Sequence, residues 1–566
     1  MENKLKLIAN TLLKAAGAAQ KHVRQAPVSP NYPVFLENMR ADEQELENER
    51  AYVKENAKDL PLISVLLDAF GEKETDVNST VLSMIAQTYV KWELLIGVGL
   101  SYENADKYRD VEKVRLVMCA DEPMKWIQKE MRGDFVMMLF AGDRLSPDAL
   151  YLMSLRTEAG DYSMVYADSD QYDDKGNRRA PFFKPAYSPV SEACFGVIGR
   201  PLLVSKQLWE RVGGFKGRGA DEYRDFEMKC MKKAGSADHI PRVLLSAKRH
   251  ELIVPEEEKK LNSELVLIPG PFEGSLRMAA RKRLEPSVTI IIGEPRSALS
   301  LRNCLEAIDT VSSKKAHRII VSVCARPEGD LMRYLEILKK NKAATVVIGG
   351  ENGSLPRAFD QGAAQSFSEY LIFMSCDTIV LSPDFIEELI IPLMADGAAV
   401  SGGKLLSPDR KLLHTGKVIG LKGWEGSLYE REPDDMADLR KCYYTSVQRN
   451  VSAVSGLFMA VSSEDLANIG LFDDTLGEAG WDVEFCLRAL KKHRQIIYTP
   501  FAEAISRSAP TQYDGLSKEA MQRCYDAYRD MLLSGDPYYS PNYDYRQSVP
   551  MLAIKPEKPI KLNPLF

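Results

Sequence analysis

Two halves of the chain share one order of apolar and polar segments. Residues 61–67 and 286–292 are both proline-led runs of β-branched and aliphatic residues, the pattern of a buried parallel strand. Each run is followed by a stretch with helical spacing and then by a second apolar run, at residues 92–96 and 317–323. Because an internal repeat determines the architecture, this pattern predicts the same β-α-β unit twice.

Each half also contains a strand that ends close to an aspartate. Residues 135–140 precede Asp143 and residues 370–374 precede Asp377, and a Ser-Pro-Asp segment follows both aspartates. Strands that alternate with helices predict a mostly parallel sheet, which binds its ligands at the carboxyl ends of the strands. Asp143 and Asp377 are therefore expected where such a ligand binds.

An acid-x-acid motif follows further along each half. Asp225 and Glu227 come after a Gly-Gly-Phe segment, and Asp482 and Glu484 come after a Gly-Leu-Phe segment. Both motifs are expected at the start of a helix, where the helix dipole favours negative side chains. In the purely structural interpretation, Arg488 lies one turn after Glu484 and pairs with it.

These patterns predict an α/β chain with two large domains in tandem, since 566 residues exceed what one hydrophobic core supports. The expected parts are an N-terminal helical region (1–58), a first domain (59–250), a charged linker (251–284), a second domain (285–510) and a C-terminal helix with an extended tail (511–566). Four tyrosines of that tail, Tyr538, Tyr539, Tyr543 and Tyr545, are expected to pack along a domain surface.

Composition and charge exclude several classes of function. A formal net charge of −6 argues against a nucleic-acid partner, because phosphate contacts need a surplus of Lys and Arg. Nine cysteines without a C-x-x-C pair indicate reduced thiols, as in the cytoplasm, and neither a disulfide framework nor a zinc site. No segment reaches the roughly 18 uncharged apolar residues of a membrane span, which predicts a soluble protein.

A basic amphipathic helix is predicted near the N-terminus. Leu5, Ile8, Leu12 and Ala15 recur at helical spacing, with several lysines and Arg24 beside them. Such a helix either contacts a membrane surface, which would bring the protein to a lipid-linked acceptor, or docks on protein. Docking is favoured because the apolar face has no aromatic anchor.

Taken in order, the motifs of both halves resemble those of the family-two glycosyltransferases of the GT-A type, in the tandem form associated with bacterial surface polysaccharides. The matching segments are residues 87–94, 166–170, 181–185 and 239–241 in the first half, and residues 358–362, 414–416, 455–456 and 481–488 in the second. The tail at residues 536–542 is similar as well, so the resemblance covers the chain from about Asn31 onward. It implies two nucleotide-diphospho-sugar transferase domains in tandem.

The resemblance also implies a mechanism. A nucleotide-diphosphate leaving group carries concentrated negative charge, which a divalent cation, Mn²⁺ or Mg²⁺, would stabilise. The implied metal ligands are Asp377 and Asp143. An inverting transfer needs a carboxylate that takes the proton of the acceptor hydroxyl, and the implied bases are Asp482 and Asp225.

Further positions are implied to contact the donor or the acceptor. These positions are His414, Glu484, Glu227, Cys324 and Asp360. The implied partners are a nucleotide sugar and a glycan or lipid-linked acceptor. The second domain keeps more of the matching residues, so it is expected to be the catalyst.

The sequence departs from the family pattern at both donor sites. Only the final acid of the metal pair is present in each half, and Val98 and Cys324 stand where a base-contacting aspartate is expected. The alternative interpretation is therefore a catalytically inactive tandem that binds glycan or organises partner transferases. In that case Asp143 and Asp377 cap turns, and His414 is a hydrogen-bonded core residue. Dinucleotide and P-loop chemistry are disfavoured, because the sequence has neither glycine-rich motif.

Overall fold

A computed structural model describes residues 23–24, 29–100, 108, 111–159, 162–248, 259–283, 285–313, 317–350, 353–476, 479–507 and 518–553. The basic N-terminal helix predicted around residues 5–15 lies outside these described residues. Among the described helices, none combines the length and the apolar character that a membrane crossing requires.

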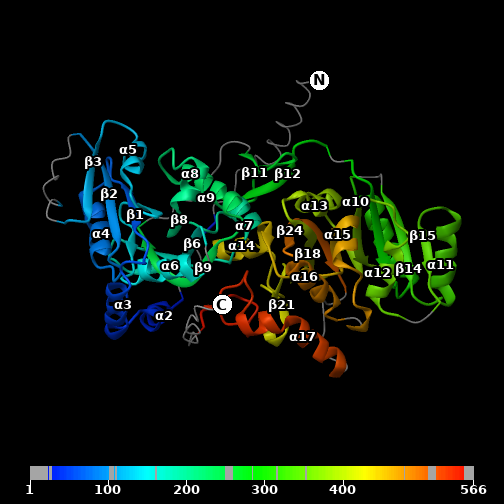
Figure 1. The fold of residues 1–566 in the computed structure, drawn as a ribbon. Helices are drawn as coiled ribbons and strands as arrows, with labels where there is room; N and C mark the ends of the chain where they lie inside the picture. Colours follow the sequence, from blue (N-terminus) through cyan, green and yellow to red (C-terminus); the bar gives the residue numbers. More distant parts are fainter. Residues whose placement is uncertain are drawn as a thin grey trace, which may run out of the picture.

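The first domain is built on a nine-stranded mixed sheet (Figure 1). Its strands are β1 (Ile63–Asp68), β2 (Trp92–Gly99), β3 (Val114–Cys119), β4 (Phe135–Phe140), β5 (Arg144–Leu145), β6 (Met164–Tyr172), β7 (Arg178–Phe182), β8 (Leu202–Ser205) and β9 (Asp238–Ala247). The helices are α2 (Tyr32–Met39), α3 (Glu43–Glu55), α4 (Glu74–Ile85), α5 (Pro123–Glu130), α6 (Ala149–Ala159), α7 (Pro189–Phe195), α8 (Lys206–Val212) and α9 (Ala220–Ala234). The strand order is β3-β2-β1-β4-β8-β6-β9-β5, with β7 paired to β6.

The second domain contains a ten-stranded sheet. The strands of this half are β13 (Val288–Gly293), β14 (Arg318–Val323), β15 (Thr345–Ile348), β16 (Tyr370–Ser375), β17 (Thr378–Val380), β18 (Ala398–Leu406), β19 (Leu412–His414), β20 (Lys417–Ile419), β21 (Glu425–Ser427), β22 (Arg449–Asn450), β23 (Phe458–Ser462) and β24 (Gln495–Ser506). The helices are α10 (Ala298–Val311), α11 (Gly329–Lys340), α12 (Leu355–Ala363), α13 (Phe385–Ile390), η2 (Ile391–Met394), η3 (Leu421–Gly423), α14 (Leu439–Ser446), α15 (Ser463–Ile469), η4 (Asp474–Leu476), α16 (Trp481–Lys491) and α17 (Lys518–Ser534). The strand order is β15-β14-β13-β16-β23-β18-β24-β17, and β20 and β21 form a separate pair.

The two sheets repeat one topology. In each sheet the first four strands of the order pair in parallel, as β1 does with β2 and β4, and as β13 does with β14 and β16. An antiparallel strand then follows, β8 in the first domain and β23 in the second, before a further parallel pair. The predicted duplication of an α/β unit is confirmed. The ends of β4 and β16 place Asp143 and Asp377 at equivalent edges of their sheets.

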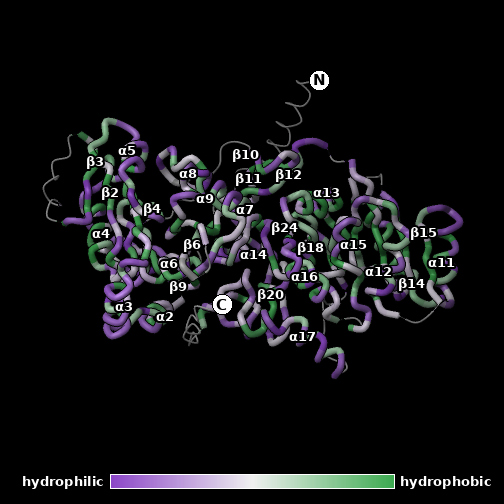
Figure 2. The backbone as a smooth tube through the Cα atoms, viewed as in Figure 1, coloured by the Kyte–Doolittle hydropathy of each residue, from purple (hydrophilic) through white to green (hydrophobic). Residues whose placement is uncertain are grey.

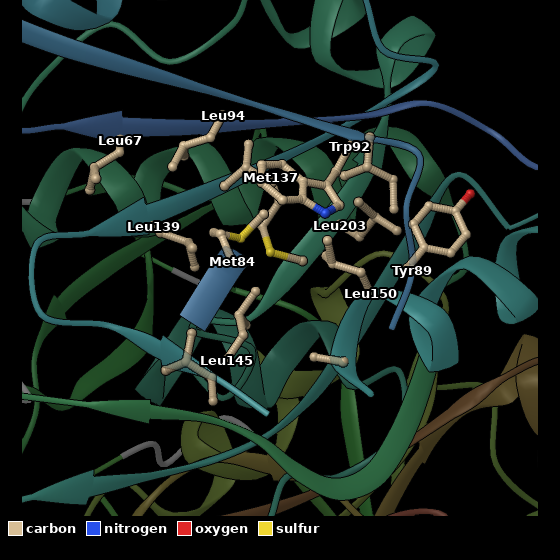
Figure 3. Packing of buried hydrophobic residues seen from close by; sticks show 14 of the residues in the cluster. Leu67, Met84, Tyr89, Trp92, Leu94, Met137, Leu139, Leu145, Leu150 and Leu203 are labelled. Atoms are coloured by element: carbon tan, nitrogen blue, oxygen red, sulfur yellow. The ribbon is translucent and has the colours of Figure 1, made fainter. Parts of the chain in front are cut away.

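Buried apolar side chains fill the space between each sheet and its helices. In the first domain Trp92, Met137 and Leu203 of the sheet pack with Met84 of α4 and Leu150 of α6 (Figure 3). Burial of each such side chain contributes roughly 1.5–3 kcal/mol. Hydrophobic residues concentrate in the central strands of both domains, whereas α3 and α17 are mainly hydrophilic (Figure 2). This core makes a rigid frame for the strand ends.

The region predicted as the linker contains a small antiparallel sheet. Its strands are β10 (Lys259–Lys260), β11 (Leu265–Pro269) and β12 (Leu276–Ala280). Leu267, Phe272 and Met278 share one buried cluster with Cys194 of the first domain and Ile497 of the second. The two domains are therefore joined by a common apolar core in addition to the chain itself.

The C-terminal tail returns across both domains, and lies below their junction in Figure 1. Tyr539 and Tyr543 are buried in a cluster with Phe183 of the first domain and Tyr444 of the second. Asn542 Nδ2 donates hydrogen bonds to the Asp168 carboxylate and to the carbonyl of Pro241, at 3.2 and 3.0 Å. The prediction that this aromatic tail packs on the domains is confirmed.

Candidate functional site

A cavity of about 700 Å³ lies at the carboxyl ends of the first domain's strands. Its walls include residues at the ends of β1 and β4, residues of α9, four residues of α14 from the second domain, and Tyr543 of the tail. Figure 1 shows α14 at the junction of the two domains, beside α7. The charged residues that line the cavity are Lys73, Lys184, Arg200, Arg218, Arg224, Lys248, Arg440, Asp68, Glu72, Asp76, Asp143, Asp170 and Glu227. We call it the first-domain cavity.

Asp143, an implied metal ligand, lies in this cavity and is paired with an arginine. Arg200 Nε and Nη2 donate to the two carboxylate oxygens of Asp143, at 2.6 and 3.2 Å. The backbone N–H of Phe140 donates to Asp143 Oδ2 at 2.9 Å. The guanidinium lies 3.9 Å from the centre of the Phe140 ring. Both oxygens of Asp143 are thus bonded to donors from the protein.

Two further cations along the cavity wall are held by carboxylates. Arg218 makes two bonds to Asp68, at 2.6 and 3.1 Å, and it also donates to the carbonyl of Phe70. Lys248 pairs with Asp76, near the start of α4. These ion pairs hold the cationic groups at the ligand end of the sheet.

One wall of the cavity contains buried ionisable side chains. Glu227 and Arg224 of α9 are 3% and 2% exposed. Burial raises the pKa of Glu227 well above its ordinary range, and Glu192 adds to the shift. Burial also lowers the pKa of Lys184 to about 7, against the opposing effects of Asp168 and Glu227. Among the described residues, Glu227 Oε1 and Arg224 Nε have no hydrogen-bond partner.

Asp225, an implied base, faces away from the cavity that Glu227 lines. Its carboxylate pairs with Lys259 of β10 at 2.8 Å, and its side chain is 46% exposed. Neighbours two positions apart on a helix project about 200° apart, so the helix presents only one of the two acids to the ligand end. Of the first-domain acid-x-acid motif, the structure brings Glu227 alone to the cavity.

Asp225→Asn is expected to change stability by no more than about 0.5 kcal/mol, because it removes only a surface ion pair. Nucleotide-sugar binding should stay the same, since the side chain lies outside the cavity. Thermal unfolding with and without a sugar nucleotide measures both quantities. A loss of binding in a folded variant would contradict this placement of Asp225.

Asp482, the implied base of the second domain, is enclosed by hydrogen-bond donors. Its carboxylate accepts from Lys417 Nζ at 2.9 and 3.1 Å, from the N–H of Gly456 at 2.9 Å and from the N–H of Val483 at 2.8 Å. Lys417 also contacts Glu425 at 3.2 Å. Burial alone lowers the pKa of Lys417, but the two acids outweigh it and the pKa is raised. Asp482 therefore lies in a buried ion pair.

The space around the start of α16 is filled by aromatic rings. Trp481 packs against Phe359 and Phe472, with ring centres 5.7 and 5.0 Å away. A Cβ atom added to Gly456 would lie only 2.1 Å from the Trp481 ring, so glycine is required for this contact. The residue that precedes Asp482 is thus a core side chain of the second domain.

His414 is a fully buried residue with two hydrogen-bonded ring nitrogens. The N–H of Ser455 donates to Nε2 at 3.1 Å, and Nδ1 lies 3.2 Å from the hydroxyl of Ser427. Because Nε2 accepts, the proton of the neutral ring is on Nδ1. Burial lowers the pKa of His414 well below its ordinary value, and Lys417 and Arg449 add to the shift. The ring is neutral and fixed in place.

Asp377 and Cys324 lie at the ends of β16 and β14. Cys324 is buried, its thiol donates to the carbonyl of Ser354 at 3.5 Å, and burial raises the thiol pKa to about 12. The backbone N–H of Asp377 donates to the Ser375 hydroxyl at 3.2 Å. Neither residue lines the first-domain cavity.

Glu484 and Asp360 lie on α16 and α12. Arg488 Nε donates to both oxygens of Glu484, at 2.7 and 2.9 Å, which is the pairing expected from their spacing. Asp360 accepts a hydrogen bond from the N–H of Phe472 at 3.3 Å. Burial raises the pKa of Asp360 to about 7. Both acids therefore serve contacts within the second domain.

Asp360→Asn is expected to raise the unfolding temperature at pH 8 and to leave it nearly unchanged at pH 4. When folding raises the pKa of an acid, the folded protein loses stability as the pH climbs above the unfolded pKa of that acid, here near 3.8. The loss levels off above the folded pKa of about 7. The amide removes that ionisation and keeps an acceptor for Phe472. Thermal unfolding of both proteins across this pH range measures the difference, and an equal shift at pH 4 and pH 8 would contradict the assignment.

A divalent cation in a protein is held by several oxygen ligands that surround one point. Within the described part of the chain, no three His, Cys, Asp or Glu side chains gather to hold a metal ion. In the first domain, Arg200 occupies both oxygens of Asp143, so this site does not fit a divalent cation. In the second domain, Asp377 is a single carboxylate, which substrate phosphates and water would have to complete.

Comparison with known proteins identifies distant relatives. No family model matches the chain. The chain is 25% identical over 519 residues to the O-antigen biosynthesis protein RfbC of Myxococcus xanthus, covering 85% of this chain and 40% of that protein. It is 24% identical over 534 residues to the uncharacterized protein y4gI of Sinorhizobium fredii, covering 85% and 57%. The chain thus spans about half the length of the curated relatives it matches.

Solved structures overlap with parts of the chain. GalNAc-T7 with UDP, GalNAc and Mn²⁺ aligns at 14% identity and a TM-score of 0.35, over 44% of this chain and 50% of that one. The mannosyltransferase PcManGT from Pyrobaculum calidifontis, in complex with GDP-Man and Mn²⁺, aligns at 13% identity and a TM-score of 0.32, over 46% and 68%.

The repeated sheet and the relationship to an O-antigen biosynthesis protein agree with the class predicted from the sequence. The chain has two α/β domains in tandem that share one sheet topology.

Proposed function

We propose that this chain binds a nucleotide-diphosphate sugar in the first-domain cavity and transfers the sugar to a glycan or lipid-linked acceptor of surface polysaccharide synthesis. The cavity carries this proposal. Its volume of about 700 Å³ is within the range of roughly 300–1,000 Å³ typical of small-molecule sites. It lies at the carboxyl ends of parallel strands, where α/β sheets bind their ligands.

The lining of the cavity offers groups that can bind the diphosphate of such a donor and groups that can pack on its sugar or base. Arg200 and Arg218 each use Nε and Nη2 on a carboxylate, and their remaining N–H groups can donate to phosphate oxygens. Tyr443, Tyr444 and Tyr543 line the side formed by α14 and the tail, where their rings can pack on a sugar or a base. The second domain then contributes a wall of the donor site through α14.

Glu227 is the proposed base of an inverting, single-displacement transfer. The acceptor oxygen attacks the anomeric carbon while the bond from that carbon to the diphosphate oxygen breaks, and the electron pair leaves with the diphosphate. The hydroxyl proton moves to the Glu227 carboxylate. A raised pKa makes the ionised form of this acid a stronger base than an ordinary glutamate. This arrangement assigns the chemistry to the first domain, whereas the sequence motifs favoured Asp482 of the second.

Cofactor and location complete the proposal. A Mn²⁺ or Mg²⁺ ion at Asp377 would supply charge stabilisation to a diphosphate in the second domain, and no step of the first-domain mechanism depends on it. A cytoplasmic location is consistent with nine cysteines that are all buried and free. A lipid-linked acceptor would require the protein to approach the membrane surface.

The test is incubation of the protein with a panel of UDP-, GDP- and dTDP-sugars, with nucleotide release and thermal unfolding as readouts. We expect at least one donor to raise the unfolding temperature and to release its nucleoside diphosphate slowly by hydrolysis or transfer. Failure of every donor to shift the unfolding temperature would sink the proposal.

A second candidate is a binding protein without turnover. The observation that favours it is that three of the four implied metal-site or base carboxylates pair with cations: Asp143 with Arg200, Asp482 with Lys417 and Asp225 with Lys259. A donor that binds at micromolar concentration, yet releases no nucleotide with any glycan or lipid-linked acceptor, would favour this function over the transferase.

A further inference from the structure

We propose that the first-domain cavity neutralises the diphosphate of its ligand with guanidinium and ammonium groups in place of a divalent cation, with Arg200 as the central group. The inference rests on the proposed function of the same cavity. It concerns a narrower question, which is what balances the charge of the bound diphosphate.

The first observation is the position of the Arg200 guanidinium. It is bonded to both oxygens of Asp143, the residue that the family resemblance assigns to the metal. A guanidinium has five N–H donors, and Nε and Nη2 use only some of them on Asp143. The Phe140 ring packs against one face of the guanidinium and restricts its orientation. The remaining donors can therefore bind phosphate oxygens in a fixed direction.

The second observation is that other cations are held along the same wall. Arg218 and Lys248 are anchored by Asp68 and Asp76, so little reorganisation is needed when an anion enters. Arg440 reaches the cavity from α14.

The acids that line the cavity offset part of this positive charge, so a bound anion depends on N–H donors that the ion pairs leave unused. Asp68, Asp76 and Asp143 each hold one of the cations just described. Asp170 is bonded to Arg178 at 2.7 Å and to the Tyr32 hydroxyl at 2.5 Å. Glu227 keeps its proton more readily than an ordinary glutamate, because burial raises its pKa. Glu72 is a further acid of the lining, and an anionic ligand therefore meets cations that are held in place by, and partly compensated by, neighbouring carboxylates.

The third observation concerns polar atoms without a partner. Arg224 Nε and Glu227 Oε1 belong to cavity-lining side chains that are 2% and 3% exposed, and among the described residues neither atom has a hydrogen-bond partner. Buried polar atoms are almost always bonded in folded proteins. A polar ligand in the cavity would supply the missing partners.

The experiment is calorimetric titration of the full chain with UDP and with GDP, once in EDTA and once in Mn²⁺. The dissociation constant of the nucleoside diphosphate that binds should agree within about threefold between the two buffers. Arg200→Gln should weaken binding by about 10-fold or more in both, as expected for lost hydrogen bonds to a charged group. The matched control is Arg156→Gln, because Arg156 pairs with Asp238 outside the cavity and its side chain is 16% exposed, against 15% for Arg200.

Asp143→Asn separates the two kinds of site most sharply. A metal site loses its ligand and should bind at least 10-fold more weakly, whereas a guanidinium site keeps Arg200 and should bind equally well or more tightly. Thermal unfolding checks that each variant is folded. If Arg200→Gln does not fold, Arg218→Gln takes its place, because the Arg218 side chain is 45% exposed.

The outcomes are distinguishable. Binding that disappears in EDTA and returns with Mn²⁺ overturns this inference and leaves the proposed function intact. Absence of binding by both nucleotides in both buffers overturns the inference and the proposed function together. Equal binding in both buffers, with a loss in Arg200→Gln and no loss in Asp143→Asn, supports the inference.

Discussion

Asp482→Ala is expected to lower the free energy of unfolding by about 3–5 kcal/mol, because it leaves a buried ammonium group without its closest partner. Lys417 is 2% exposed, and its Nζ lies 2.9 Å from Asp482. The variant also removes the acceptor for the N–H of Gly456. Urea denaturation, followed by tryptophan fluorescence, measures the change, since Trp481 adjoins the substituted residue.

Glu484→Ala is the matched control for this variant. Glu484 lies on the same helix and pairs with Arg488 four residues later, in a partly exposed position. Its loss should cost only about 0.3–0.5 kcal/mol. If Asp482→Ala were as stable as the control while nucleotide release disappeared, the second domain would be the catalyst and the first-domain account would be wrong.

Glu227→Gln is expected to lower turnover by about 10²–10⁴-fold and to leave donor binding within a few-fold of the wild type. The amide has nearly the same shape as the acid but takes up no proton. The control is Glu210→Gln, an acid on the neighbouring helix α8 that is exposed and does not line the cavity. Initial rates and dissociation constants, measured on the same preparations, separate the two effects.

The same residue sets the pH dependence of turnover. Burial raises the pKa of Glu227 above its ordinary value of 4.5, so the ionised base is lost as the pH falls through the raised pKa. The rate should therefore rise with pH and level off above that pKa. The residual rate of Glu227→Gln should not show this rise. A rate that is constant across the range for both proteins would contradict the role of Glu227.

The architecture was predictable because buried strands leave a strong local signal. The apolar runs at residues 61–67 and 286–292 became β1 and β13, and the repeated order of runs became a repeated sheet. The positions of Asp143 and Asp377 followed from the rule that ligands bind at the carboxyl ends of parallel strands.

The partners of the candidate acids were not predictable from the sequence. Arg200 is 57 residues from Asp143, and Lys417 is 65 residues from Asp482. Such pairs form only when the sheet brings distant segments together, and neither cation lies in a local motif. A helical motif also does not tell which of its acids faces a cavity, as Asp225 and Glu227 show.

The contribution of the second domain to the cavity was missed for a similar reason. The wall from α14 depends on how the two domains pack, and on the cluster in which Phe182 and Phe195 contact Tyr443. Nothing in the α14 segment predicts this contact. The second domain can therefore matter to the ligand site without being the catalyst.

The most direct measurement is photoaffinity labelling of the full chain with an azido-substituted UDP- or GDP-sugar, followed by mass spectrometry of the labelled peptides. The account predicts label on peptides that line the first-domain cavity, such as those with Phe182, Arg200 or Tyr443, and competition by unlabelled donor. Competed label on peptides containing Cys324 or Asp377 would place the donor in the second domain and contradict the central claim.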